Sequence, residues 1–405
     1  MLNHFEKHNI LTSLNHGFRS GYSCETQLLI TIDDLMQNYN SGIQTDVAIL
    51  DFSKAFDTVP HDKLIGKLRS YGIQGPLLAW LSHFLSDRTM RVICEGKQSS
   101  DAKVGSGVPQ GTVLGPLLFL CHINDLPERV KSTVRLFADD CLLYRQIRNE
   151  SDKAALQDDL LSLEKWAEEW GMRFNAKKCY IMHISPKRNK HTHMYSLGGH
   201  ILECVKDNPY LGLQISEDLK WNKHIRLTAN KAAVALGMLR RNLKFLPKTY
   251  KSTAYISMVR SILEYGSIVW DPFLKQDIQC LERVQKRAAR FIVSDYRTQS
   301  QGFMTRTLKD IGLPPLQQRR LYNRLSFFYK ITNGLVPAIQ QDAHLTPLDN
   351  KRRIRPTQYT GYDSKNPIVK RSRNNSKCFT NIDSKCSQYK NSFFSKNCSR
   401  LEYTG

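Results

Sequence analysis

The sequence has no long apolar run and no paired-cysteine motif. Its longest apolar segment, residues 113–121, contains a glycine and a proline and is far shorter than the roughly 20 residues of a membrane-spanning helix. No apolar core of a signal peptide follows the first methionine. The ten cysteines include no Cys-x-x-Cys pair, which argues against a zinc ribbon and suits a reducing compartment. We therefore expect a soluble intracellular protein, nuclear or cytoplasmic, that is neither secreted nor membrane-bound.

Acidic residues are also scarce. The 405 residues include 37 Asp and Glu against 59 Lys and Arg, which gives a formal net charge of +22. A positive field of this size favours a polyanionic partner. Nucleic acid is preferred over an anionic membrane, because no strongly basic amphipathic helix is evident. The hydrophobic content of 41% is that of a globular protein.

Residue periodicity divides the chain into a mixed part and a helical part. Apolar residues at helical spacing up to Trp170, followed by Gly171, predict an amphipathic helix. Another helix is expected from Thr58, with Pro60 in its first turn. Predicted helices cover 25–37, 58–71, 113–121 and 156–170, and predicted strands cover 46–51, 134–136, 141–144, 179–184 and 210–215. This mixture indicates an α+β or two-layer α/β domain.

From Trp221 onward the pattern is helical. One stripe is apolar and the rest of the helix is rich in basic residues; the stripe residues are Ile225, Ala229, Ala232, Leu236 and Leu239. Helical patterning continues through residues 281–292 and 316–331. After about residue 350 the chain is rich in Lys, Arg, Asn and Ser with little periodicity, so a disordered tail is expected there.

Two adjacent aspartates, Asp139 and Asp140, interrupt an apolar segment that predicts a hairpin. Aspartate is common in turns, and this alone would explain the pair. Two carboxylates close enough to repel each other would alternatively bind a divalent cation. Asp51, at the end of another predicted strand, offers a third carboxylate, although Asp57 or Thr58 nearby is expected to cap the next helix. Three convergent carboxylates are the ligand set for two Mg²⁺ ions.

A glycine-rich segment, residues 105–116, lies between the two aspartate sites. It has neither the Gly-Lys-Ser/Thr ending of a Walker loop nor the Gly-x-Gly-x-x-Gly of a dinucleotide fold. It is either a turn before an apolar helix or a loop whose backbone approaches a base pair, to which Gln110 offers its amide.

These segments resemble motifs A, B and C of reverse transcriptases from non-LTR retrotransposons of the LINE and jockey type. The matching residues are Asp51-Phe-Ser-Lys-Ala-Phe-Asp, Ser106-Gly-Val-Pro-Gln-Gly and Phe137-Ala-Asp-Asp, in that order. Three further segments are similar to the end of the fingers region, to motif D and to the primer grip: His16-Gly-Phe-Arg-Ser-Gly, Gly171-Met-Arg-Phe-Asn-Ala-Lys-Lys and Tyr210-Leu-Gly. The similarity continues to about Pro337.

The resemblance implies a right-hand polymerase fold of the α+β class. It places partial fingers in residues 1–45, the palm in 46–218, a helical thumb and C-terminal helical region in 219–345, and a basic tail in 346–405. The implied activity is RNA-directed DNA polymerisation with an RNA template, a DNA primer and deoxyribonucleoside triphosphates. Two Mg²⁺ ions, or Mn²⁺, are the implied cofactors.

The resemblance also implies roles for single residues. Asp51, Asp139 and Asp140 would bind the metal ions, with the main-chain carbonyl of Phe52 as a further ligand. Lys178 would protonate the departing pyrophosphate, unless it is an ordinary solvated lysine. Phe56 would exclude a 2′-hydroxyl, unless it is a plain core aromatic. The other implied nucleotide and template contacts are Pro109, Gln110, Gly111, Phe137 and Ala138, and the implied primer grip is Tyr210, Leu211 and Gly212.

The similarity starts close to the first residue of the chain. Earlier fingers segments and the endonuclease domain that usually precedes them are therefore expected to be missing, which would make the chain N-terminally truncated. The alternative function is that of an inactive retrotransposon remnant that binds nucleic acid through its basic surface.

Overall fold

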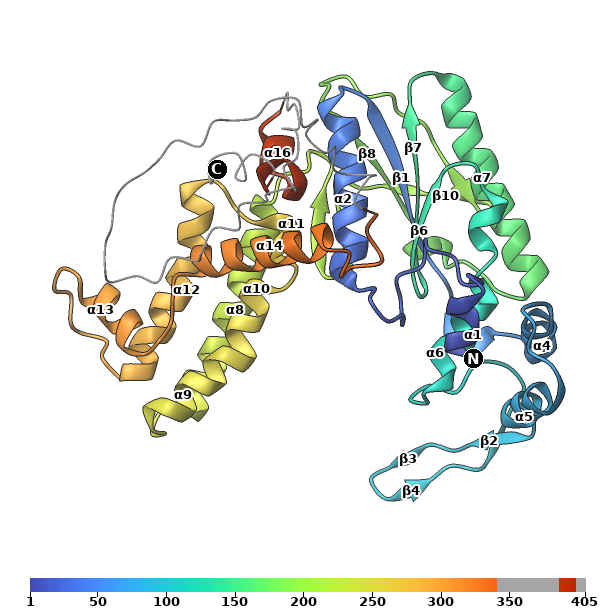
Figure 1. Cartoon of the computed structure of the whole chain (residues 1–405), viewed down its shortest axis with the longest axis horizontal. Coiled ribbons are helices and arrows are strands. Elements are labelled where there is room, and N and C mark those ends of the chain that lie inside the picture. The colour runs from blue at the N-terminus through green and yellow to red at the C-terminus, as the bar shows by residue number, and fades with distance from the viewer. Residues whose placement is uncertain (341–385, 398–405) are drawn as a thin grey trace. The chain divides into compact units, whose positions relative to one another are not determined.

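The computed structural model describes residues 1–340 and 386–397. The chain forms two compact units, Met1–Leu219 and Lys220–Gly405 (Figure 1). The division of these units into fingers, palm and thumb stays a prediction. None of the helices in the described ranges has the length and apolar character that a bilayer crossing requires.

The first unit mixes helices and strands, as expected. Its helices are α1 (Leu2–Lys7), α2 (Cys24–Asn40), α3 (Ala55–Thr58), α4 (His61–Ser70), α5 (Gly75–Leu85), α6 (Leu114–Ile123), η1 (Leu126–Arg129), α7 (Glu150–Trp170) and η2 (Ala176–Lys178). Its strands are β1 (Gln44–Asp51), β2 (Arg88–Met90), β3 (Ile93–Cys94), β4 (Lys97–Gln98), β5 (Ala102–Val104), β6 (Thr133–Phe137), β7 (Asp140–Ile147), β8 (Tyr180–Ile184), β9 (Ser196–Leu197), β10 (His200–Ile201), β11 (Glu203–Cys204), β12 (Asp207–Tyr210) and β13 (Leu213–Ser216).

A five-stranded sheet in the order β11-β8-β1-β7-β6 is the centre of this unit. The pairs β8–β1, β1–β7 and β7–β6 are antiparallel, and β11 joins β8 in parallel. The central strand β1 is buried over most of its length. Buried strands are apolar because both of their faces are covered, which is why the sequence predicted β1, the β6–β7 hairpin and β8 correctly.

Helix α7 covers one face of the sheet. Its Leu156, Leu160 and Leu163 are fully buried and belong to the same core cluster as Ala48 and Leu143 of the sheet. Each fully buried leucine contributes roughly 2 kcal/mol through removal of apolar surface from water. The helix ends where the sequence predicted, because Gly171 adopts φ +72° at its C-terminus.

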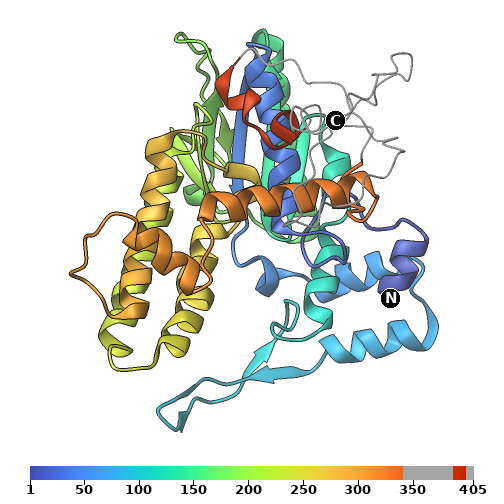
Figure 2. The ribbon, with the colours of Figure 1, turned by 60° about the vertical axis from the view of Figure 1, so that its left-hand side comes forward.

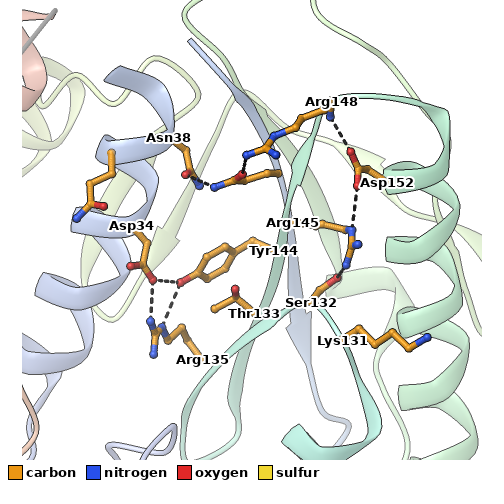
Figure 3. Close-up of a pocket in the computed structure, with 12 residues that line it drawn as sticks. Asp34, Asn38, Lys131, Ser132, Thr133, Arg135, Tyr144, Arg145, Arg148 and Asp152 are labelled. Carbon is orange, nitrogen blue, oxygen red and sulfur yellow. Dashed lines mark hydrogen bonds and ion pairs between the residues drawn. The ribbon is translucent and has the colours of Figure 1, made fainter. Parts of the chain in front are cut away.

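Helix α2 packs on the opposite face and is tied to it by polar contacts (Figure 3). Asp34 accepts hydrogen bonds from the Arg135 guanidinium, at 2.7 Å, and from the Tyr144 hydroxyl. Asn38 Oδ1 accepts a hydrogen bond from Gln146 Nε2 at 2.6 Å, and Asn38 Nδ2 donates one to the Thr45 hydroxyl. A polar cleft of about 570 Å³ lies beside these residues. The network fixes the helix on the face of the sheet that carries Tyr144.

Two predictions at the start of α4 are wrong. Helix α4 begins at His61, three residues later than the expected start at Thr58, so Pro60 is its N-cap residue and does not lie in its first turn. Neither Asp57 nor Thr58 caps it, because Asp57 instead accepts a hydrogen bond from Gln110 and Thr58 bonds the Lys54 carbonyl.

The predicted strand at 210–215 is a hairpin, β12–β13, rather than a single strand. Its two turn residues, Leu211 and Gly212, have φ of +45° and +82°. Positive φ at both central positions is the type I′ geometry, which reverses the chain within two residues.

Another hairpin, residues 88–104, extends from α5 away from the sheet (Figure 2). Residues 89–103 are exposed throughout, and the tip turns at Glu95 and Gly96, both with positive φ. The sequence predicts no structure here, since the segment has no buried face and hence no alternation of apolar residues.

The second unit is helical in its described part. Its elements are α8 (Asn222–Asn242), α9 (Lys248–Tyr255), the π-helical η3 (Ile256–Arg260), α10 (Ser261–Glu264), α11 (Ser267–Trp270), α12 (Lys275–Val293), α13 (Phe303–Asp310), α14 (Leu316–Thr332) and α16 (Ser387–Lys390). The stripe predicted from Ile225 to Leu239 is buried in α8, which confirms that prediction.

Most of the predicted disordered tail lies outside the described residues. Segment 386–397 lies within them and departs from the prediction, because it contains α16 and buries Phe393 and Phe394. Its Lys396 reaches the buried carboxylate of Asp271, which also accepts hydrogen bonds from Arg320 and Arg324. These contacts explain the local order of a segment whose composition alone suggests none.

Candidate active site

The two adjacent aspartates lie at the tip of the β6–β7 hairpin. Ala138 and Asp139 form the turn, and Asp140 is the first residue of β7. Ala138 adopts φ +53°, a left-handed conformation that costs an L-residue about 1–2 kcal/mol. The turn therefore persists only because its surroundings hold it.

Asp51 lies directly opposite Asp140. The two residues are Cα partners in the β1–β7 register, and Phe137 is the partner of Asp140 on the other side. Residues directly opposite in an antiparallel pair point to the same face. The fold thus brings Asp51, Asp139 and Asp140 to one end of the sheet, with Phe137 beside them.

The carboxylates influence one another's ionisation. Burial raises the pKa of Asp140 to about 6, and the negative charges of Asp139 and Asp51 add to the shift. Burial and Asp51 also raise the pKa of Asp139. Like charges that are held close together in this way are stabilised by a bound cation.

Whether these residues fit a metal ion depends on the ion. Within the described residues, no group of three or more His, Cys, Asp and Glu side chains forms a ready metal cluster. Magnesium does not need one, because it usually takes one or two carboxylates and completes its shell with water and substrate phosphates. The oxygen ligands and the mutual repulsion of Asp51 and Asp140 fit Mg²⁺ or Mn²⁺.

Lys178 and Phe52 lie next to this cluster. Lys178 Nζ is 3.8 Å from Asp51 Oδ2 and its side chain is 68% exposed, so it faces the same open region. Phe52 follows Asp51 directly, and its buried ring stacks on Phe174 at 4.3 Å. The roles of the lysine and of the Phe52 carbonyl stay predictions.

Asn15 is a site residue that the sequence alone does not reveal. Its carboxamide Oδ1 accepts hydrogen bonds from Ala138 N at 3.2 Å and from Gly17 N at 3.0 Å. The residue is buried, and its backbone forms a parallel bridge with Leu136 of β6. Asn15 therefore braces the left-handed turn that carries Asp139.

Gly17 completes this brace. A Cβ atom at Gly17 would lie 2.5 Å from Ala138 N, closer than van der Waals contact allows. Any larger residue would push the segment away from the aspartate turn. The only sequence signal was the Gly17-Phe-Arg segment itself, which the resemblance assigned to the fingers without linking it to Asp139.

The glycine-rich loop packs against the chain that follows Asp51. A Cβ atom at Gly107 would lie 2.8 Å from backbone atoms of Phe56 and Asp57, so this glycine permits the contact. Val108 N donates to the Phe56 carbonyl at 2.8 Å, and Gln110 Nε2 donates to Asp57 Oδ1 at 2.8 Å. The loop and Phe56 are thus one assembly.

The remaining loop residues surround an exposed amide. Pro109 is buried and its carbonyl accepts a hydrogen bond from the Thr112 hydroxyl at 2.7 Å, while Gly111 adopts φ +75°. Gln110 between them is exposed. Its amide is therefore accessible to a ligand, although Asp57 holds it in this state.

Phe56 is half-buried. Its ring stacks on Phe119 at 4.3 Å and meets Phe18 edge-on at 6.2 Å. This environment is compatible with both earlier interpretations, since one part of the ring packs in the core and another remains accessible.

The predicted primer-grip hairpin reaches the face of the sheet on which α2 packs. Tyr210 is buried, and its hydroxyl accepts a hydrogen bond from Gln27 of α2 at 3.3 Å. Burial raises the pKa of the Tyr210 phenol, and the charge of Asp140 acts in the same direction. The hairpin therefore lies within electrostatic reach of the aspartates.

Known proteins resemble this chain. Residues 1–215 match the family model "Reverse transcriptase (RNA-dependent DNA polymerase)". A Drosophila melanogaster protein described as "Probable RNA-directed DNA polymerase from transposon X-element" is 30% identical to this chain over 303 residues. The match covers 71% of this chain and 32% of that protein. The corresponding enzyme from the mobile element jockey of the same fly is 27% identical over 290 residues, or 68% of this chain and 31% of that protein.

The chain spans about a third of the length of these curated relatives. Among solved structures, apo telomerase from Candida tropicalis aligns with 84% of this chain and 58% of its own, at 11% identity and a TM-score of 0.43. The relatives confirm the resemblance to retrotransposon enzymes of the LINE and jockey type. The chain belongs to the reverse transcriptase (RNA-dependent DNA polymerase) family.

Proposed function

We propose that the chain is the RNA-directed DNA polymerase core of a non-LTR retrotransposon. The observation that carries the proposal is the register of β1 and β7, which sets Asp51 opposite Asp140 beside the braced Asp139. The proposed substrates are an RNA template, a DNA primer with a free 3′-hydroxyl and deoxyribonucleoside triphosphates.

In this proposal the three aspartates and the Phe52 carbonyl hold the divalent ions. Two Mg²⁺ or Mn²⁺ ions bound there would activate the primer 3′-oxygen and stabilise the leaving oxygen. Lys178, whose ammonium is 3.8 Å from Asp51, is proposed to donate a proton to the departing pyrophosphate.

The other residues are proposed to position the substrates. The Phe56 ring would lie under the deoxyribose and exclude a 2′-hydroxyl. Phe137, Ala138 and the Pro109–Gly111 loop would contact the nucleotide and template, and the Tyr210–Gly212 turn would hold the primer. Residues 1–45, 46–218 and 219–345 would be the partial fingers, palm and thumb, with the basic face of α8 along the template-primer phosphates.

Primer extension by the purified chain tests the proposal. Extension should require Mg²⁺ or Mn²⁺, and Asp139→Asn and Asp51→Asn should each abolish it, because each removes a metal ligand. Template-primer affinity should remain nearly unchanged, because it depends mainly on Lys and Arg contacts to phosphates. Equal extension by wild type and both variants would refute the assignment. Binding without extension by the wild type would favour the inactive remnant instead.

A further inference from the structure

A basic cavity of about 560 Å³ lies in the helical unit, far along the chain from the aspartates. It lies where the end of α8 meets the turn that follows α12. Arg240, Arg241, Lys244, Phe245 and Tyr296 line it, together with two small residues. These five residues are called the basic–aromatic pocket.

The lining of the pocket is positively charged. Three of its lining side chains are cationic and none is acidic. The neighbouring carboxylate, Asp295, accepts hydrogen bonds from Arg297 N and from the backbone and hydroxyl of Thr298, so it is engaged within its own turn. The lining itself therefore offers three cations and no acidic side chain, while the Asp295 charge is held in the adjoining turn.

Helix dipoles offer a competing explanation for these cations. Arg240 and Arg241 lie in the last turn of α8, and α12 also ends beside the pocket. The C-terminus of a helix carries roughly half a negative charge, so two helix ends offset about one positive charge. Because three cations line the pocket, its net charge stays positive after this correction and after the neighbouring Asp295 carboxylate is counted.

Dipoles do not explain the exposed aromatic rings. Phe245 is 92% exposed and Tyr296 is 51% exposed. The Arg240 guanidinium lies 5.1 Å from the Tyr296 ring centre, and the Lys244 ammonium lies 5.3 Å from the Phe245 ring centre. Exposed rings interleaved with cations are the arrangement by which proteins stack unpaired bases and contact the adjoining phosphates.

We propose that the basic–aromatic pocket binds single-stranded nucleic acid. An unpaired base stacks on Phe245 or Tyr296, while Arg240, Arg241 and Lys244 contact the flanking phosphates. A duplex fits less well, since its bases already stack on one another and offer no free face. The site needs none of the three aspartates, so it stands independently of the proposed polymerase activity.

The test separates stacking from charge. Fluorescein-labelled oligo(dT) is the single-stranded probe, heparin is a polyanion without bases, and poly-glutamate represents an acidic peptide. Phe245→Leu and Tyr296→Leu remove a ring and keep every charge, whereas Arg240→Gln removes one charge. Tyr322→Leu is the matched control, because Tyr322 is 71% exposed in α14 and outside the pocket.

Each ring variant should weaken oligo(dT) binding about 5- to 100-fold without altering the affinity for heparin. Arg240→Gln should instead lower the dependence of log affinity on log salt by about 0.7, because one fewer phosphate contact releases one fewer counterion. Tyr322→Leu should match the wild type. Asp139→Asn should also match it, so a failed polymerase assignment would leave this result unchanged.

The Phe245→Trp variant places a fluorescent probe of ligand binding in the pocket itself. The fluorescence of Phe245→Trp should be quenched by oligo(dT), through stacking, and not by heparin or poly-glutamate. Unchanged oligo(dT) affinity in both ring variants would overturn the proposal. Equal losses for oligo(dT) and heparin, or quenching by poly-glutamate, would overturn it as well, because the pocket would then be a general anion or acidic-peptide site.

Discussion

Asn15 and Ala138 are 123 residues apart in sequence, yet the Asn15 carboxamide oxygen accepts a hydrogen bond from Ala138 N at 3.2 Å. The same oxygen accepts a second bond from Gly17 N. A single buried side chain thereby connects the N-terminal segment to the turn that carries Asp139. This relationship makes Asn15 a positioning residue for the proposed active site.

Replacing Asn15 with leucine should slow primer extension while leaving the KM for primer-template unchanged. The variant keeps the side-chain volume but leaves the two N–H groups of Ala138 and Gly17 buried without an acceptor, at about 1–3 kcal/mol each. The strained turn would then relax and move Asp139. Steady-state extension and urea unfolding measure both effects.

Asn3→Leu is the control for this variant, because Asn3 is exposed in α1. It should behave as the wild type in both assays. An Asn15→Leu variant that is less stable but has unchanged kcat would show that the residue supports the fold without positioning the aspartates.

Replacing Phe56 with valine should raise the use of ribonucleotides relative to deoxyribonucleotides. The smaller side chain no longer clashes with a 2′-oxygen, whereas the contact with Phe119 is lost in either interpretation. The ratio of kcat/KM for the two sugars measures the effect. Phe119→Leu should lower stability without changing that ratio, and an unchanged ratio in Phe56→Val would identify Phe56 as a plain core aromatic.

Divalent ions should stabilise the chain above pH 6 and much less at pH 5. The pKa of Asp140 is raised to about 6, so the folded state binds its proton more tightly than the unfolded state does. This contribution to stability is complete at low pH and is lost as pH rises from about 4 through 6. Above that range the ionised carboxylates repel one another until a cation binds.

Thermal melts with and without Mg²⁺ at the two pH values measure this effect. Asp140→Asn should raise the metal-free melting temperature at neutral pH by about 2–4 °C and should reduce the response to Mg²⁺. A larger Mg²⁺ response at pH 5 than at neutral pH would contradict the charge-repulsion argument.

His122 should make the protein sensitive to acid. It is fully buried against Trp170, and burial lowers its pKa to about 3, with the charge of Lys67 acting in the same direction. The unfolded state takes up the proton near pH 6.5 while the folded state does not, so stability falls as pH drops below that value.

Between pH 7.5 and pH 5 the free energy of unfolding should fall by about 2 kcal/mol less in His122→Leu than in the wild type, as measured by urea unfolding. His83 is exposed, and His83→Gln should leave the pH dependence unchanged. The same pH slope in wild type and His122→Leu would show that other groups cause the acid sensitivity.

The sequence predicted four strands of the sheet and the aspartates at their ends, because buried strands leave an apolar pattern and a charged residue that ends one is conspicuous. It did not predict the short edge strand β11, whose two residues are exposed. It also predicted α7, whose stripe is long and is closed by Gly171. Local patterns of this kind predict the structure well because burial in the fold favours apolar residues at these positions.

The brace by Asn15 could not be predicted in the same way. Nothing in a single sequence links an asparagine to a backbone N–H group 123 residues away. The β12–β13 turn, in contrast, left a signal that was missed. Glycine is favoured at the second turn position of a type I′ hairpin, and Gly212 occupies that position.

The hairpin at residues 88–104 is a tolerant insertion point. Its tip at Glu95 and Gly96 touches no core residue, and lengthening an exposed loop costs only about 0.6 kcal/mol for each doubling of its length. A small reporter domain could therefore be grafted there without disturbing the register that pairs Asp51 with Asp140.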